Sequence, residues 1–593
     1  MIPKQLPPAF IMVVGAFLLP LLKGRWQKAF LLLLPVASFL NLISLPEGQS
    51  FVFDFLGYQV VLARVDRLSL VFGYIFHIIS FIAFLYAIHV DNPLEHMAAL
   101  VYGGCAIGAV FSGDLLSFFL FWEMLTVSSI FLIWSRETPS ALAAGYRYLL
   151  VHAAGGLCLL AGILMHISES GSMNLGYLGL HNTATFLIFI GIGVNCAWPI
   201  LHPWLTDSYP EATITGTIFL SAFTTKTAVY ALARTFPGES SLIWIGAAMT
   251  AFPIFYAVIE NDLRRVLSYS LINQVGFMVC GIGIGTQLAI NGAVSHAFND
   301  ILFKALLFMS IGAVMYRTGK VNATDLGGLY KTMPLTCIFC MVGAASISAF
   351  PLFSGFVSKS MVMEAAARGD MRLVWFMLLF ASAGVFHHAG IKIPFFAFFS
   401  HDSGIRTKEA PLNMLLAMGI ASALCIFIGS YPAPLYSILP YEANYVPYTP
   451  YHVLAQTQLL FYSSLAFTLL ILSGIYPAEI RAINLDFDWF YRKGGRLLLT
   501  FSGKVLNGVN ELSERVIVGK IVRGIARFTA DGVARVVLIP MVSFWALRGQ
   551  KGPRLEMKKR NLYNAIMKGG LPVGLGIGFA TVLIILLFFL RQG

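Results

Sequence analysis

Apolar runs of about 20 residues recur along almost the whole sequence, and each is long enough to cross a bilayer as a helix. Because lipid offers no partners for backbone groups, such runs are expected to be helices that bond internally. Of the 593 residues, 58% are hydrophobic and only 11% are charged, too few to cover a soluble protein of this size. The sequence therefore predicts an all-α polytopic membrane protein.

About sixteen candidate spans follow from these runs. They cover residues 8–22, 26–45, 66–88, 95–112, 113–134, 140–168, 183–203, 213–236, 241–260, 264–285, 288–316, 333–351, 372–400, 412–430, 453–476 and 569–590. Basic residues gather in alternate loops, which predicts that those loops are cytoplasmic and that both termini lie outside. Segment 47–63 alternates in polarity and predicts a hairpin outside the membrane. The polar segment 353–368 is expected not to cross separately, because a crossing there would place the later basic loops outside.

Residues 497–548 are amphipathic instead of uniformly apolar. Valine, leucine and isoleucine recur there at helical spacing, and charged residues occupy the other face. A continuous helix would run roughly 75 Å, although several glycines predict interruptions. These are Gly508, Gly519, Gly524 and Gly532. The pattern favours equally a helix anchored on the membrane surface and one that braces neighbouring helices.

Two ionisable residues lie near the middle of predicted spans. Glu123 is about ten residues from either end of its span, roughly 15 Å from both surfaces. Lys226 is similarly deep, and its side chain is too short to reach either surface. Charges at this depth are costly unless they are paired or neutral, and a moving partner changes their protonation. Both residues are candidates for a proton relay, with a structural clamp between helices as the alternative for Glu123.

The stretch GAVSHAFNDILFKALLFMSIGAV carries three ionisable residues on one helical face. His296, Asp300 and Lys304 follow one another at intervals of four, so they stack over about 12 Å of helix. A stripe of this kind inside an apolar span is typical of a hydrated ion path.

A further pair lies in GVFHHAGIKIPFF, where His388 and Lys392 again share a helical face. Pro394 follows directly and predicts a kink or break, a feature that transporters often place at the ion site.

The sequence contains no phosphate-binding loop, zinc-protease motif or nucleophile elbow. Its seven cysteines lie in apolar runs without metal-ligand or disulfide spacing. We therefore expect no cofactor, no metal and no catalytic site within the chain itself. The formal charge of +12 arises in loops and near the C-terminus, which fits anionic lipid headgroups better than nucleic acid.

Several stretches resemble one known family. They are SGDLLSFFLFWEM (112–124), HPWLTDSYPEA (202–212), TTKTAVYALAR (224–234), NDLRRVLSYSLINQVGFM (261–278), HAFNDILFKALLF (296–308) and FPLFSGFVSKS (350–360). In this order, over most of residues 60–430, they resemble the antiporter-like L, M and N subunits of respiratory complex I and the related Mrp cation/proton antiporters. SGD and DSYP are nearer to the D subunit of Mrp antiporters, whereas the amphipathic stretch with a final span resembles the lateral helix of the complex I L subunit.

The resemblance implies two inverted five-helix repeats, each with a broken helix, around a central polar axis. It implies a charge-pair carboxylate at Glu123, relay lysines at Lys226 and Lys304, a relay histidine at His296, and an exit-side lysine at Lys392. The expected parts are N-terminal helices (1–94), the two repeats (95–236 and 241–430), an additional span with a basic linker (431–496), the amphipathic helix with a second basic linker (497–568), and a C-terminal anchor (569–593).

The chain departs from the family pattern at the site that faces Glu123. The family usually has a lysine nine residues before the tryptophan that matches Trp204, and this chain has Asn195 there. Because that lysine normally pairs with the glutamate, Glu123 needs another partner. The alternatives are Lys226, His152 and Arg147. Asp300 also stands where some relatives have a second histidine. The auxiliary site candidates are Arg147, His152, Asn195, His202 and Lys359.

The resemblance implies an ion-translocating member of a larger complex in a bacterial or archaeal inner membrane, with other membrane subunits as partners. SGD and DSYP favour an antiporter similar to the Mrp D subunit, which moves protons, with sodium or potassium left open. The lateral helix favours a proton-pumping subunit of a redox complex, such as a complex I-like NADH:quinone oxidoreductase or a membrane hydrogenase. A non-pumping structural subunit, or the membrane half of a bicarbonate-concentrating system, is a third alternative.

Overall fold

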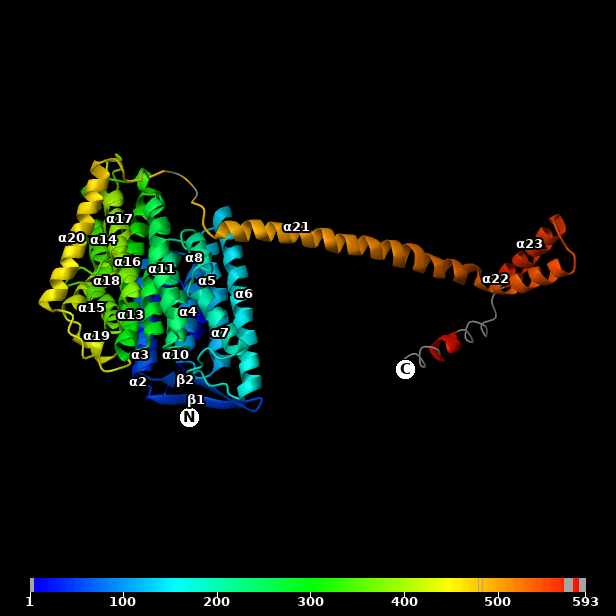
Figure 1. Ribbon diagram of the computed structural model, residues 1–593, viewed down its shortest axis with the longest axis horizontal. Helices are drawn as coiled ribbons and strands as arrows, with labels where there is room; N and C mark the ends of the chain where they lie inside the picture. The colour runs from blue at the N-terminus through cyan, green and yellow to red at the C-terminus, as the bar shows by residue number, and fades with distance from the viewer. Residues whose placement is uncertain (1–4, 478, 481, 483, 570–579, 586–593) are drawn as a thin grey trace. The chain divides into compact units, whose positions relative to one another are not determined.

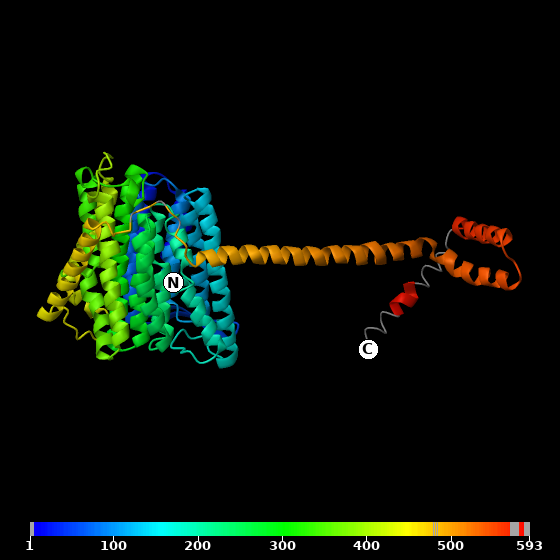
Figure 2. The same ribbon diagram turned by 45° about the horizontal axis from the view of Figure 1, so that its top comes forward.

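The computed structural model describes residues 5–477, 479–480, 482, 484–569 and 580–585. They belong to two compact units, Met1–Asp488 and Trp489–Gly593. Eleven helices in the described part are long and apolar enough to cross a membrane, and four more are apolar but shorter. In the first unit these helices run side by side as a bundle, seen in Figure 1 and again in the turned view of Figure 2. The all-helical membrane fold is thereby confirmed. Most of the expected final span, 569–590, lies outside the described residues.

The N-terminal part consists of three helices and a hairpin. The elements are α1 (Phe10–Leu18), α2 (Arg25–Ser44), β1 (Gly48–Phe55), β2 (Tyr58–Val65) and α3 (Arg67–Ala87). The hairpin predicted from 47–63 is confirmed, and its antiparallel register places Gly48 opposite Val65. It lies at one end of the bundle (Figure 1).

Two repeats follow, each with its own broken helix. The first consists of α4 (Pro93–Phe111), α5 (Leu115–Trp134), α6 (Pro139–Ser170), α7 (Thr183–Asn195), α8 (Pro203–Ser208), α9 (Gly216–Ala222) and α10 (Thr224–Thr235). The second consists of α11 (Ser240–Ile259), α12 (Leu263–Ile284), α13 (Gln287–Thr318), α14 (Pro334–Ile347), α15 (Ser354–Arg368), α16 (Arg372–Val385) and α17 (Lys392–Pro394). Segment 353–368, which the sequence predicted not to cross the membrane separately, is the second half of a broken helix.

The repeats share local features at the same sequence spacing. Asp114 bridges Asn174 just before α5, and Asp262 bridges Asn322 just before α12. The caps of the next helices, Thr138 and Thr286, recur at this spacing too. A chain that builds the same caps and bridges twice in order has the internal symmetry expected of a repeat transporter fold.

The broken helices contain the same strained turn. Between α7 and α8, Ala197 and Ile200 have φ of 57° and 75°; between α14 and α15, Ala349 and Leu352 have φ of 56° and 75°. Non-glycine residues rarely adopt positive φ, and each costs of order 1–3 kcal/mol unless the surroundings hold it. Because the strain recurs at both breaks, the surrounding packing must enforce it, and it leaves helix ends exposed inside the bundle.

The helix that carries Lys392 is distorted but not ended at Pro394. Helical backbone continues from Arg372 to Phe399, with π-helical segments Phe386–Ile391 and Phe395–Phe399 on either side of α17. A π-helical turn widens the helix locally, which accommodates the ring and the missing N–H of the proline. The kink predicted at Pro394 therefore takes the form of π turns, and no break occurs.

The first unit closes with α18 (Leu412–Ser430), α19 (Ala433–Ser437) and α20 (Pro450–Leu472), and residues 473–487 then lead to α21 (Asp488–Ser513). The second unit continues through a π-helical segment, Glu514–Val522, into α22 (Arg523–Leu547) and then α23 (Pro553–Lys568). Of the interruptions predicted from the glycines, the one at Gly519 takes the form of this π-helical segment, and those at Gly508, Gly524 and Gly532 are wrong. A single glycine costs only about 1 kcal/mol in a helix, and here the run continues through a π turn around Gly519. Part of the expected basic linker is also helical, as α23.

Charged contacts join the loops at each end of the bundle. Lys331 and Arg406 both pair with Asp402, at 2.7 Å. Their hydrogen bonds, Arg406 first, hold the pKa of Asp402 well below its usual range. At the hairpin end, Arg234 forms a bidentate pair with Asp66, with both N–O distances 2.7 Å. Loops that the sequence assigned to one side of the membrane are thus in contact with each other.

We predict that Asp114→Ala loosens the hairpin and the start of α5 together. The Asp114 carboxylate accepts hydrogen bonds from the backbone N–H groups of Val61 and Ser117, at 2.8 Å each. Losing the helix cap and leaving a buried N–H unpaired should cost about 1–3 kcal/mol. Thermal unfolding in detergent should show a lower apparent Tm, and the exposed hairpin residue Asp54 provides the control variant, Asp54→Ala. Equal Tm values for the two variants would contradict the role of Asp114.

Candidate ion-translocation site

Buried ionisable residues form a cluster in the middle of the first unit. Each is at most 1% exposed, and they come from α10, α13, α15, α17 and the π-helical segment before α17. They are Lys226, His296, Asp300, Lys304, Lys359, His388 and Lys392. So many ionisable groups in an apolar interior are costly, and in membrane proteins such groups mark ion paths.

Asp300 is the negative centre of this cluster. Its Oδ2 lies 2.6 Å from the Lys226 Nζ, and neither side chain is exposed. Asp300 also interacts electrostatically with Lys304 and Lys359. One carboxylate can neutralise one ammonium group, so the net charge of the cluster depends on how many protons the three lysines carry. The structure thus brings Lys226 to Asp300 and Lys304 of the predicted stripe, a meeting that the sequence did not predict.

The Lys226 ammonium also contacts an interrupted helix. Its Nζ donates to the Ser221 carbonyl, at 2.9 Å. Ser221 lies in α9, which ends at Ala222, and Lys226 lies in α10, which begins at Thr224. Carbonyls at such a helix end lack intrahelical donors and attract cations.

The α13 stripe makes polar contacts with two neighbouring helices. Lys304 Nζ donates to the Ser270 hydroxyl of α12, at 2.9 Å. The His296 ring lies 3.1 Å from both the Ser358 hydroxyl of α15 and the Gln274 side-chain oxygen of α12. A neutral histidine can donate at one nitrogen and accept at the other, so His296 is held between two groups that suit a proton relay.

Lys359 has a more central position than its sequence context indicated. It lies in α15, and its Nζ donates to the Ile347 carbonyl at the end of α14, at 2.9 Å. The same ammonium lies 5.1 Å from the centre of the Phe277 ring. Lys359 therefore binds the free end of the broken helix and shares Asp300 with Lys304. The broken helix, which only the fold reveals, explains why the sequence ranked it as auxiliary.

His388 and Lys392 continue the cluster. His388 interacts electrostatically with both Lys304 and Lys392. The Lys392 Nζ donates to the carbonyls of Val258 and Glu260, at 2.7 Å each, and forms an ion pair with Glu479, at 2.9 Å. The ionisable groups thereby form a series from Lys226 through Asp300 to Lys392.

Glu123 is the exception, because none of the three expected partners reaches it. Arg147 instead forms a bidentate pair with Asp207, at 2.6 and 3.0 Å. Lys226 pairs with Asp300, and the His152 ring stacks on Tyr148 with 3.9 Å between the ring centres. Within the described residues, Glu123 Oε1 has no hydrogen-bond partner. All three predicted pairings are therefore wrong.

The repeat symmetry explains the difference between the two halves. At the spacing that relates Asp114 to Asp262, His152 and Gly156 of α6 take the places of Asp300 and Lys304 of α13. Glu123 packs directly against Gly156 in the space where a side chain would be. Asn195, where the family lysine is expected, is buried with both side-chain polar atoms unpartnered in the described part of the chain. The first repeat thus keeps a carboxylate but no lysine beside it.

Two further carboxylates reach the bundle from segment 473–487, and no sequence motif pointed to them. Besides Glu479, the segment contributes Asp486, whose two oxygens lie 3.1 Å from His202 Nε2 at the start of α8. The Tyr269 hydroxyl also donates to Asp486, at 2.8 Å. Burial acts against ionisation, but the hydrogen bonds from His202 and Tyr269 hold the pKa of Asp486 below its usual range. Sequence reasoning missed both carboxylates because they lie in a connecting segment far along the chain.

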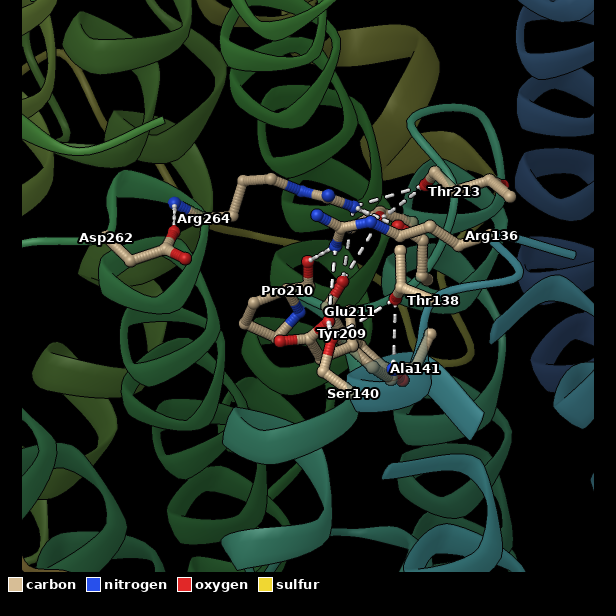
Figure 3. A network of polar contacts seen from close by, with 12 residues as sticks. Arg136, Thr138, Ser140, Ala141, Tyr209, Pro210, Glu211, Thr213, Asp262 and Arg264 are labelled. Atoms are coloured by element: carbon tan, nitrogen blue, oxygen red, sulfur yellow. Dashed lines mark hydrogen bonds and ion pairs between the residues drawn. The ribbon is translucent and has the colours of Figure 1, made fainter. Parts of the chain in front are cut away.

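Two arginines hold the loop that follows α8. Arg264 is 2% exposed, and its guanidinium donates to the carbonyls of Ala212 and Thr213, at 3.0 and 3.1 Å. Arg136 donates to the Pro210 carbonyl, at 2.6 Å. Figure 3 shows both side chains converging on this loop from α12 and from the end of α5. They satisfy carbonyls that the interrupted helix leaves free, and so fix one end of the first broken helix.

The site and the fold define a multi-pass membrane protein with two broken-helix repeats around a buried series of ionisable groups. The sequence profile of the family described as "NADH:quinone oxidoreductase/Mrp antiporter, TM" matches residues 112–387. Over these residues the chain is similar to the membrane subunits that this profile describes.

Individual relatives are distant in sequence. Hydrogenase-4 component B of Escherichia coli is 25% identical over 413 residues, which are 62% of each chain. The A subunit of the Na(+)/H(+) antiporter of Alkalihalophilus pseudofirmus is 27% identical over 420 residues, 62% of this chain and 52% of the relative. The chain thus spans less than two thirds of these relatives.

Solved structures share the fold. The Mrp complex from Dietzia sp. DQ12-45-1b matches with a TM-score of 0.74 at 21% identity, over 90% of this chain and 62% of that one. The archaeal membrane-bound sulfane sulfur reductase matches with a TM-score of 0.68 at 21% identity, over 90% and 99% of the two chains.

We predict that Lys226 and Asp300 are energetically coupled. Lys226→Met or Asp300→Asn alone leaves a buried partner uncompensated and should destabilise the protein by about 3–5 kcal/mol. The double variant removes both charges and should be clearly more stable than the sum of the single losses predicts. Apparent Tm values of the four proteins in detergent test this double-mutant cycle, and additive losses would show that the two residues do not depend on each other.

Proposed function

We propose that the chain is a proton-translocating member of a multisubunit membrane complex, with cation/proton antiport in the manner of the Mrp D subunit as the first candidate. The observation that carries this proposal is the series from Lys226 through Asp300, Lys304 and His388 to Lys392, which spans three or more helices without leaving the apolar interior. Groups of this kind can pass a proton between neighbours when the local charge changes.

Within this series the described residues suggest roles. Asp300 would hold a proton-dependent balance among Lys226, Lys304 and Lys359, because it interacts with all three. His296 would pass a proton between its two polar neighbours, and His388 would join the central cluster to Lys392. The strained breaks would let the two halves of each broken helix shift as the charges change.

The first candidate mode is supported by the motifs SGD at 112–114 and DSYP at 207–210, which resemble the Mrp D subunit, and by relatives named as subunits of a Na(+)/H(+) antiporter. Mrp complexes contain several subunits, so other membrane subunits are the proposed partners. Sodium or potassium would be the exchanged cation.

A second candidate is a proton-pumping role within a redox complex. The second unit favours it, because α21 and α22 form one long amphipathic run, as in the lateral helix of the complex I L subunit. No residue of α21 is buried within the described structure, and its apolar side chains are exposed over its whole length. An exposed apolar stripe of this length is expected to be buried against another surface, and partner membrane subunits would provide that surface. The relative named hydrogenase-4 component B also supports this mode.

We predict that Glu123→Gln and Lys304→Ala each abolish coupled ion movement without preventing assembly. The first removes the one carboxylate of the α5 span, and the second removes the lysine between Asp300 and His388. Proton movement would be measured with a pH-sensitive dye in inverted membrane vesicles that contain the complete complex. Glu364→Gln is a matched control, because Glu364 is partly exposed and pairs with Arg368 one turn along α15. Wild-type rates in both variants would show that Glu123 and Lys304 do not belong to a proton relay.

The same vesicles separate the two modes. An antiporter should dissipate an imposed pH gradient when sodium or potassium is added, with no electron donor present. A redox-driven pump should acidify the vesicle interior only while its oxidoreductase partner turns over, whatever the alkali cation.

We predict that Asn195→Lys is tolerated. The Asn195 side chain is buried with both polar atoms unpartnered in the described structure, so the local fold gains no hydrogen bond from it. A lysine would reintroduce the ammonium group that family members place at this position. Assembly, measured as the amount of intact complex in native gels, should match wild type. Failure to assemble would show that this chain has repacked the site around asparagine.

A further inference from the structure

Lys392 is held by four oxygen atoms at the end of the buried series. Three are backbone carbonyls at the C-terminal end of α11, from Ala257, Val258 and Glu260, at 3.3, 2.7 and 2.7 Å from Nζ. The fourth belongs to the Glu479 carboxylate, at 2.9 Å. Carbonyl oxygens stabilise an ammonium group but do not take its proton. Of the four oxygens, only the carboxylate oxygen of Glu479 can accept the proton.

Glu479 belongs to the connecting segment and not to a spanning helix. Its side chain is 7% exposed, and the Lys392 side chain is fully buried. Burial raises the pKa of the Glu479 carboxyl, whereas Lys392 lowers it, and the net direction is upward. A carboxyl with a raised pKa beside an ammonium group can hold a proton at less cost than an exposed one.

Glu479 also lines a cavity of about 370 Å³. Phe395, Phe396, Ile471 and Tyr476 line its walls, and His401, Gly474 and Pro477 at its edge are exposed. The cavity therefore reaches the surface, at the end of the bundle where the basic loop around Thr324 also lies. It is large enough for several water molecules.

We propose that Glu479 is the terminal proton carrier of the path and that this cavity is its mouth. In the outward step an N–H bond of the Lys392 ammonium breaks and an O–H bond forms on Glu479, which leaves a neutral amine and a neutral carboxyl. Glu479 then passes the proton to cavity water and returns to the carboxylate. For proton uptake the same two transfers occur in the reverse order. This inference rests on the proposed proton translocation.

Other titratable and charged groups surround this pair. Glu260 contributes from the end of α11, and its carboxylate lies 4.0 Å from Arg265 of α12. His387 and His388 contribute from the π-helical segment, Tyr476 from the connecting segment, and His401 from the cavity edge. Glu260 Oε2 accepts a hydrogen bond from Asn484, at 3.0 Å, so it is already engaged beside the path.

The alternative is that Glu479 only ties the connecting segment to the bundle. Asn484 provides the matched comparison, because it ties the same segment to Glu260 without being titratable. Glu479→Gln keeps the size and the hydrogen-bonding ability of the side chain but cannot carry a proton. A purely structural role would make Glu479→Gln and Asn484→Ala behave alike.

The test uses inverted vesicles that contain the complete complex, with proton movement followed by dye and protein amount by immunoblot. Glu479→Gln should lower the initial rate by about 100-fold, the contribution typical of a positioned proton carrier. Glu479→Asp should keep most of the rate with a shifted pH profile. Asn484→Ala and Glu364→Gln should stay within about twofold of wild type.

Several results would overturn the proposal. A Glu479→Gln rate close to wild type would do so, as would equal losses in Glu479→Gln and Asn484→Ala. If Glu479→Gln fails to accumulate, the pH profile of Glu479→Asp decides, and an unchanged profile overturns the role of Glu479. If Lys304→Ala abolishes movement while Glu479→Gln does not, only this inference fails. If wild type moves no protons, or Lys304→Ala keeps the wild-type rate, the proposed function fails as well.

Discussion

The interaction on which the structure depends is the buried ion pair between Lys226 and Asp300, at 2.6 Å. In a low-dielectric interior an isolated charge is prohibitively costly, so each such charge needs a partner of opposite sign or a helix end. Asp300 supplies the negative charge, interrupted helices supply carbonyls to Lys226 and Lys359, and the C-terminal end of α11 supplies them to Lys392. The breaks in the helices are thus what allows several lysines to remain inside an apolar bundle.

This requirement relates fold and function. The interior of a continuous helix satisfies its own carbonyls, whereas a helix end, a break or a π-distorted turn leaves some of them free. The strained turns at Ala197 and Ala349 are kept in both repeats, as expected when the packing around them repays the strain. The two repeats then diverge in charge. The second carries the stripe from His296 to Lys304, and the first has His152 and Gly156 at the corresponding places.

The asymmetry affects how the first half of the path can work. Glu123 packs against Gly156 and receives no hydrogen bond at Oε1 within the described residues. It is also only partly buried in this chain, near the middle of α5. A carboxylate in that position is partly accessible at the surface of this chain. The charges of the second repeat, by contrast, meet partners elsewhere in this chain, because Asp300 pairs with Lys226 of α10 and Lys392 pairs with Glu479.

The sequence by itself determined the membrane-spanning helices, the hairpin and the α13 stripe, because hydropathy and helical period are local properties that neighbouring residues set. Only the tertiary structure decided which charges meet. Asp300 pairs with Lys226 from a helix far earlier in the chain, Glu123 meets none of its expected partners, and Glu479 reaches Lys392 from a connecting segment. Electrostatic pairing depends steeply on distance and on the surrounding dielectric, and both follow from how distant helices pack, which the order of residues does not display.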